Sequence, residues 1–179
     1  GSNFSKKMKI NCNLRGEHSS GFINGVFSLN NNQHHEIRTI INHLVENTKS
    51  YQLIKSVLGK NAKAAYQGKI FVNSKAQKTD GYQLSKAILL DETSEFNAKP
   101  ELEIYADDVK CSHGCTVGQL DKEALFYLKT RGIPEKEARA LLTYAFANNV
   151  LESVNIPNLK RRINSLIANK LGVNLGFDL

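Results

Sequence analysis

The sequence has few cysteines, and it lacks the long apolar run that a membrane-spanning helix needs. Its three cysteines, Cys12, Cys111 and Cys115, form neither an even set nor a C-x-x-C pair, so we expect free thiols in a reducing compartment. No run of about 18 apolar residues occurs, which excludes a transmembrane helix. No N-terminal segment resembles a signal peptide. A Walker-type G-x-x-x-x-G-K-[ST] loop is also missing, which excludes that class of nucleotide site.

Positive charge is in excess, but it is not concentrated. The net charge is +7, from 24 basic and 17 acidic residues. Residues 1–120 carry 15 Lys or Arg and 11 Asp or Glu, a net +4, and residues 121–179 carry 9 and 6, a net +3. A clustered basic stripe, the usual footprint of nucleic-acid binding, is therefore missing. We interpret the charge as an aid to solubility and expect neither a nucleic-acid nor a membrane partner.

The 179 residues divide into two parts of different character. At 41% hydrophobic residues, the chain is able to bury a core. Before residue 120, strand-length apolar stretches alternate with polar turns, and they are Phe22–Phe27, Ile37–Val45, Ile70–Val72, Ala87–Leu90 and Leu102–Tyr105. After it, the apolar period becomes helical. We therefore predict a strand-rich domain over residues 1–120 and a helical domain over residues 121–179.

An internal repeat occurs in the strand-rich part. Residues 50–58 (SYQLIKSVL) and residues 81–89 (GYQLSKAIL) share five identical positions at an offset of 31. Residues 66–69 resemble residues 96–99 at an offset of 30. A unit that returns at nearly constant spacing predicts stacked coils, as in a parallel β-helix or solenoid. The alternative is chance similarity within a biased composition.

Three helices are predicted in the C-terminal part. Asp121 is a typical N-cap for a helix over residues 122–131, and Gly132 is typical of the position just after a helix end. Pro134 and Pro157 fit the first positions of a second and a third helix. A four-residue stripe predicts that the second helix is long and amphipathic, with Ala138, Leu142, Phe146, Val150 and Val154 on one face.

Cys111, His113 and Cys115 are spaced by two residues. On a strand, alternate side chains share one face and lie about 6.5–7 Å apart. Two of the three could reach one metal ion or an iron–sulfur cluster, whereas zinc with four protein ligands would need more donors. Gly114 leaves open a bend that would separate these side chains. The alternative is that the thiols are small buried hydrophobes and His113 is structural.

Glu101, Glu103, Asp107 and Asp108 form an acidic cluster. Paired carboxylates perform acid–base chemistry on sugars, so a carbohydrate-active β-helix enzyme that uses Asp107 and Asp108 is a rival hypothesis. However, Glu101 and Glu103 alternate with apolar residues, which is typical of a strand with one solvated face. A generic protein-interaction solenoid is a third hypothesis.

Several long motifs occur in an order that resembles one known family. The motifs are YQGKIFV at residues 66–72, AQKTD at 76–80, KPELEIYADDVKCSHG at 99–114, VGQLD at 117–121 and ALFYLKTRGI at 124–133. They resemble the SufB/SufD family of the SUF iron–sulfur cluster assembly system, over residues 36–154 and closest to its SufD branch.

The resemblance implies a mainly β fold, a right-handed parallel β-helix followed by a small C-terminal helical domain. It also implies a non-catalytic scaffold that pairs with SufB through the β-helix and binds the ATPase SufC through its C-terminal helices. We expect no cofactor held stably by this chain alone, because the nascent iron–sulfur cluster is shared with SufB. The expected location is the cytoplasm, or a plastid in a plastid-bearing eukaryote.

The resemblance also implies roles for individual residues. His113 matches the histidine of the family's Lys-Cys-Ser-His-Gly motif, so it is a candidate cluster or metal ligand at the SufB interface. Cys111 and Cys115 are weaker candidates, because Cys115 stands where the family has a small residue without a thiol. We expect some residues of the helical part to contact SufC, among them Leu125, Phe126, Tyr127, Arg139 and Phe146.

We expect this chain to be a C-terminal portion of such a protein. The family has an N-terminal helical region and earlier coils, and Gly1-Ser2 is typical of an expression scar. A β-helix that begins at an open coil exposes strand edges. An isolated chain is therefore expected to form a homodimer.

Overall fold

The computed structural model describes residues 4–173, which form eight strands followed by three α-helices and one short 3-10 helix. The strands are β1 Ser5–Leu14, β2 Ser20–Leu29, β3 His34–His43, β4 Lys49–Leu58, β5 Lys63–Val72, β6 Thr79–Leu89, β7 Glu95–Ile104 and β8 Val109–Gly118. The helices are α1 Lys122–Thr130, α2 Glu135–Asn148, the 3-10 helix Asn149–Leu151 and α3 Pro157–Leu171.

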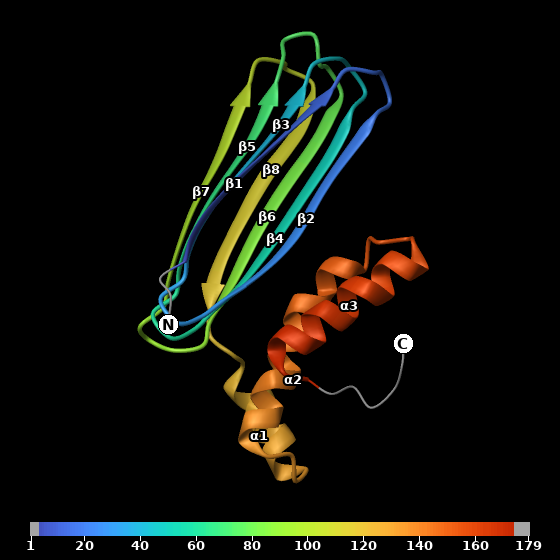
Figure 1. The fold of residues 1–179 in the computed structure, drawn as a ribbon. Helices are drawn as coiled ribbons and strands as arrows, with labels where there is room; N and C mark the ends of the chain where they lie inside the picture. Colours follow the sequence, from blue (N-terminus) through green and yellow to red (C-terminus); the bar gives the residue numbers. More distant parts are fainter. Residues whose placement is uncertain (1–3, 174–179) are drawn as a thin grey trace.

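The strands form two parallel sheets that face each other. One sheet has the order β1-β3-β5-β7 and the other the order β2-β4-β6-β8, so successive strands alternate between them. Paired strands are separated by between 29 residues (Ser5 opposite His34) and 32 residues (Lys63 opposite Glu95). Two strands make one coil, and the eight strands make about four turns of a β-helix (Figure 1). The predicted parallel β-helix followed by helices is confirmed.

The core lies between the two sheets, because alternate residues of each strand point into that space. The burial pattern of β5 alternates strictly between buried and more exposed residues. The largest fully buried apolar side chains come from the three inner strands β3, β4 and β5, and include Ile37, Ile41, Ile54, Tyr66 and Ile70. Each such side chain contributes about 1.5–3 kcal/mol when buried, so these inner coils supply most of the hydrophobic stabilisation.

The first sequence repeat corresponds to a pair of stacked strands. Ser50 lies opposite Gly81 and Leu58 lies opposite Leu89, so β4 pairs with β6 at the predicted offset of 31. The second predicted alignment is wrong. Tyr66 lies opposite Ala98, an offset of 32, whereas the sequence alignment placed it opposite Phe96.

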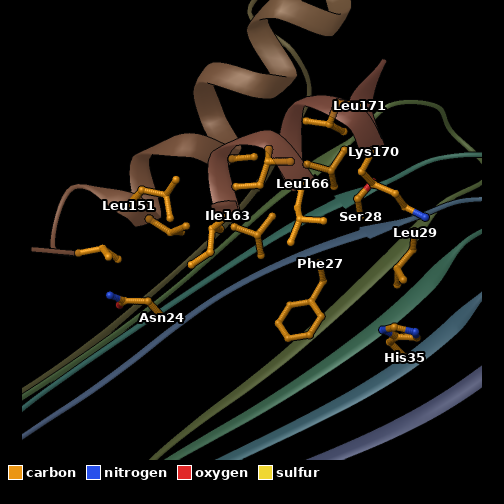
Figure 2. A pocket seen from close by; sticks show the side chains of 16 residues that line it. Asn24, Phe27, Ser28, Leu29, His35, Leu151, Ile163, Leu166, Lys170 and Leu171 are labelled. Atoms are coloured by element: carbon orange, nitrogen blue, oxygen red, sulfur yellow. The ribbon is translucent and has the colours of Figure 1, made fainter. Parts of the chain in front are cut away.

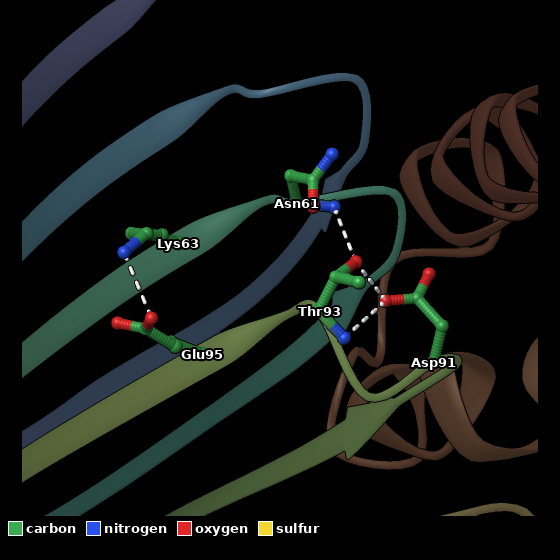
Figure 3. Close-up of polar contacts among 5 residues, drawn as sticks. All are labelled: Asn61, Lys63, Asp91, Thr93 and Glu95. Carbon is green, nitrogen blue, oxygen red and sulfur yellow. Dashed lines mark hydrogen bonds and ion pairs between the residues drawn. The ribbon is translucent and has the colours of Figure 1, made fainter.

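The turn that follows β6 explains this difference. Residues 59–62 connect β4 to β5, but residues 90–94 connect β6 to β7, which is one residue more. Asp91 accepts hydrogen bonds in this turn from the backbone N–H of Lys60 at 2.5 Å and from the hydroxyl of Thr93 at 2.6 Å. Thr93 in turn accepts from the backbone N–H of Asn61 at 3.0 Å (Figure 3). These bonds lower the pKa of Asp91 to about 2 and hold successive turns together.

The first two helices begin near their predicted starts. The Asp121 carboxylate accepts from the backbone N–H of Glu123 at 2.8 Å and of Ala124 at 3.1 Å, which confirms it as the N-cap of α1. Gly132 follows the helix end with φ +84°, as expected for that position. Pro134 is the N-cap of α2 and not its first helical residue, so that prediction was one residue off.

The long second helix predicted from the stripe is divided in the structure. α2 ends at Asn148, and a 3-10 helix follows at residues 149–151. Val150 therefore lies in the 3-10 helix and Val154 lies beyond it. Asn148 and Asn149 are poor helix formers, and this favours a break at that point. α3 begins at Pro157, as predicted.

α2, the 3-10 helix and α3 pack on the outer face of the even-strand sheet (Figure 1). Leu53 of β4 forms an apolar cluster with four buried residues of these helices, namely Ala147, Val150, Leu151 and Ile167. α1 packs mainly on α2, and none of its side chains is buried. The outer face of β4 is therefore covered, whereas α1 extends beyond the strands.

Candidate functional site

The predicted Cys-x-His-x-Cys motif lies on β8, which is an edge strand paired with β6 alone. Cys111, His113 and Cys115 lie opposite three buried residues of β6, namely Gly81, Gln83 and Ser85. All three side chains therefore share the inner face of the sheet, as the spacing predicts. Gly114 does not interrupt the strand, which runs without a break from Val109 to Gly118.

The three side chains differ in their surroundings because β8 belongs to the last coil. Cys111 is half-buried, and desolvation raises the pKa of its thiol. His113 and Cys115 are exposed. The sulfur of Cys115 lies 4.0 Å from the hydroxyl oxygen of Ser85. The motif is thus accessible from the end of the β-helix.

This arrangement by itself is not a resident metal site. Within residues 4–173, no three His, Cys, Asp or Glu side chains come close enough to hold one metal ion. Same-face neighbours on a strand lie about 6.5–7 Å apart, whereas ligands of a single zinc ion lie about 2.0–2.3 Å from it. His113 with one adjacent thiol supplies at most two donors here. A bound iron–sulfur species would need further donors from another surface.

A row of polar side chains lies behind His113 at the same register. Gln52, Gln83 and His113 occupy equivalent positions in three successive coils. Gln52 donates to the side-chain oxygen of Gln83 at 3.4 Å, and Gln83 donates to the carbonyl oxygen of Gly68 at 3.3 Å. We did not predict this row, although Gln52 and Gln83 are identical positions of the sequence repeat. Their recurrence was the available signal.

His43 is buried in the same interior and has a structural role. Its two ring nitrogens form hydrogen bonds with the hydroxyls of Thr48 at 2.7 Å and Ser50 at 2.8 Å. Desolvation lowers its pKa to about 4, so the ring is neutral at pH 7. Both nitrogens are occupied, so His43 is not available as a ligand.

The acidic cluster forms ion pairs on the outer, solvated face of β7. The Lys69 ammonium contacts Glu101 at 3.2 Å and also contacts Glu103, whose pKa is lowered by this hydrogen bond. Asp107 and Asp108 lie in the exposed turn before β8, where the backbone N–H of Asp108 donates to the Gln77 side chain at 2.9 Å. The geometry therefore favours the solvated-face interpretation over a carbohydrate-cleaving site.

The residues expected to contact SufC fall into two groups. Phe126 and Tyr127 of α1 are 69% and 56% exposed, and Leu125 is half-buried. Arg139 and Phe146 of α2 make contacts within the chain: Arg139 donates to the carbonyl oxygen of Leu90 at 2.9 Å, and the Phe146 ring lies under the ammonium of Lys55. Only the α1 residues present a free apolar surface.

Comparison with known proteins identifies the family of this fold. The model of the SUF system FeS cluster assembly SufBD core domain matches residues 3–146. The chain belongs to the SufBD family. The match includes all eight strands, α1 and most of α2, so the inner face of β8 and the exposed face of α1 both lie in the shared domain.

Curated relatives include SufD proteins from two bacteria. The iron–sulfur cluster assembly protein SufD of Escherichia coli (strain K12) is 39% identical over 158 residues, which cover 88% of this chain and 37% of the relative. SufD of Bacillus subtilis (strain 168) is 31% identical over 159 residues, 89% of this chain and 36% of the relative. Protein ABCI7, chloroplastic, of Arabidopsis thaliana is 43% identical over 75 residues, 42% of this chain and 15% of the relative.

This SufBD chain spans about a third of the length of the SufD proteins that it matches. The activity and partners of a whole SufD protein therefore do not transfer to it directly. No helix within residues 4–173 has the length and apolar character needed to cross a membrane.

Proposed function

We propose that this SufBD chain is a non-catalytic scaffold subunit of SUF iron–sulfur cluster assembly. The observation that carries the proposal is the placement of His113 on the inner face of the last coil, at an uncovered strand edge beside two thiols. A ligand at an edge is able to share its cargo with a second chain. The β-helix then serves as a rigid platform on which donors of two chains meet.

In this proposal the partner at β8 is SufB. The strand has one free edge, and its inner face supplies too few donors to hold a cluster alone. A second parallel β-helix set against this edge would satisfy the free backbone groups of β8 and add the missing ligands. The nascent iron–sulfur cluster is cargo shared by the two chains, with His113 as a ligand and Cys111 and Cys115 as secondary candidates.

The C-terminal helices are proposed to bind the ATPase SufC. Phe126 and Tyr127 form an exposed apolar surface on a helix that packs mainly on α2. Exposed aromatic residues of this kind are common anchors of protein interfaces. The proposed location follows that of the relatives, the bacterial cytoplasm or a plastid.

Anaerobic co-purification with SufB and SufC tests the proposal. We expect one complex that contains all three chains, together with iron and sulfide. A chain that purifies without either partner under these conditions contradicts the scaffold role.

Phe126→Asp tests the helical surface separately. A buried carboxylate at an apolar interface is costly, so we expect the recovery of SufC with this chain to fall at least tenfold while SufB is retained. Phe22→Asp is the matched control, because Phe22 is a similarly exposed phenylalanine (65%) on β2. Equal recovery of SufC with both variants would place the ATPase elsewhere.

A further inference from the structure

We propose that Lys55 is a positioning residue that sets the orientation of the helical arm, defined as α1 and α2 (residues 122–148), against the β-helix. The inference rests on the proposed function only for its consequence, which is that force from an ATPase on the arm reaches the strands at this point. The structural part concerns this chain alone.

Lys55 is a buried cation at the junction between sheet and helices. It lies on the outer face of β4, and only 4% of its surface is exposed. Its ammonium donates to the carbonyl oxygen of Phe146 at 2.8 Å and to the side-chain oxygen of Asn149 at 2.7 Å. It also lies 4.6 Å from the centre of the Phe146 ring. Within residues 4–173, Lys55 forms no ion pair with a carboxylate.

These contacts fix the point where α2 ends. The carbonyl of Phe146 belongs to the last turn of α2, whose carbonyl groups lack partners within the helix. A cation at a helix C-terminus also interacts favourably with the helix dipole. Asn149 begins the 3-10 helix, so Lys55 joins both sides of the break between α2 and the chain that leads to α3.

The remaining contacts between the helices and the sheet are less able to fix an angle at this end. The cluster around Leu53 is apolar, and hydrophobic contact is not directional. Arg139 bonds to Leu90 near the start of α2, and Asn24 bonds to Ser153 beyond its end at 2.6 Å. Lys55 supplies the directional contacts at the C-terminal end of α2 itself. Because α1 packs mainly on α2, its position follows from the angle of α2.

The neighbouring strand offers a matched control. Lys86 of β6 lies directly opposite Lys55 in the register and shares its face of the sheet. Lys86 is only half-buried, and within residues 4–173 its side chain forms no recorded hydrogen bond or ion pair. Replacing Lys86 removes the same charge at nearly the same place without removing the contacts to α2.

Hydrogen exchange of Lys55→Met and Lys86→Met, each as the full chain, tests the proposal. Methionine keeps the length and apolar stem of lysine but donates no hydrogen bond. We expect backbone amides of residues 146–151 and of α1 to exchange at least tenfold faster in Lys55→Met, while the amides of β4 and β6 keep their protection. Lys86→Met is expected to match the unaltered chain. Unchanged exchange of the arm in Lys55→Met overturns the proposal.

A second variant covers the case in which Lys55→Met loosens the whole fold. Asn149→Ala removes one acceptor and leaves the buried lysine in place, and we expect a smaller acceleration confined to residues 146–151 and α1. Faster exchange in the strands of both variants would mean that Lys55 only supports the core, and it would overturn the proposal. Failure of SufC to bind any variant, or the unaltered chain, contradicts the proposed function and leaves the exchange result intact.

Discussion

At the scale of single residues, the interior of the β-helix is unusual because polar side chains share it with the apolar core. The Tyr66 hydroxyl bonds to the hydroxyl of Thr39 at 2.9 Å, and Gln83 bonds to the backbone of Gly68. A Cβ added at Gly68 would collide with the Tyr66 hydroxyl and the Gln83 side-chain oxygen. Glycine inside a strand usually weakens it, but close approach of neighbouring groups explains it here.

Gly68→Ala is predicted to destabilise the fold. Both atoms that the new methyl group meets belong to buried side chains, so relief requires the polar contacts around Gly68 to shift. We expect a loss of about 1–3 kcal/mol in the free energy of unfolding, measured by chemical denaturation. Gly16→Ala is the control, because a Cβ there meets nothing within 4 Å. Equal stability of the two variants would contradict the packing described at Gly68.

The buried His43 makes the stability of the fold depend on pH. Its folded-state pKa is lowered to about 4, whereas the unfolded chain titrates near 6.5. Between these values the unfolded state binds the extra proton, so stability is complete above about pH 6.5 and falls as the pH drops towards 4. The loss at the acid end is at most about 3 kcal/mol.

Denaturant unfolding between pH 7.5 and 4.5 measures this dependence. His43→Gln keeps the capacity for hydrogen bonds but does not titrate, and we expect its stability to vary less with pH than that of the unaltered chain. His35, whose pKa is also lowered by burial, adds a component in the same direction that both proteins share. Parallel pH profiles for the two proteins would show that His43 is not a source of the dependence.

At the scale of elements, the sequence was informative where the same residue types return in successive coils. Gln52 and Gln83 lie in register, and the repeat that contains them predicted the β4–β6 pairing. The β5–β7 alignment failed because a turn gained one residue, and nothing in the strands themselves reports the length of a turn. The end of α2 was missed for a related reason. A stripe of apolar residues indicates a face, but it does not show where contacts with another element, such as those of Lys55, end the helix.

At the scale of the whole molecule, the sequence predicted a parallel β-helix followed by helices and one face that holds Cys111, His113 and Cys115. Strand periodicity is local, so that face follows from spacing alone. The position of the motif at an uncovered edge depends on how many coils follow β6, and the packing of α2 and α3 on the even-strand sheet depends on contacts distant in sequence. Together they place the β8 edge and the exposed surface of α1 on one rigid support, as a scaffold with two partners requires.

The most direct test of the scaffold account is the iron and sulfide content of the complex with SufB and SufC after anaerobic co-purification, compared between His113→Ala and Ser112→Ala. Ser112 lies on the same strand with the opposite facing, so it controls for disturbance of the β8 edge. We predict that His113→Ala lowers bound iron and sulfide at least fivefold while all three chains still co-purify, and that Ser112→Ala leaves both unchanged. Wild-type iron and sulfide in the intact complex of His113→Ala would contradict the account.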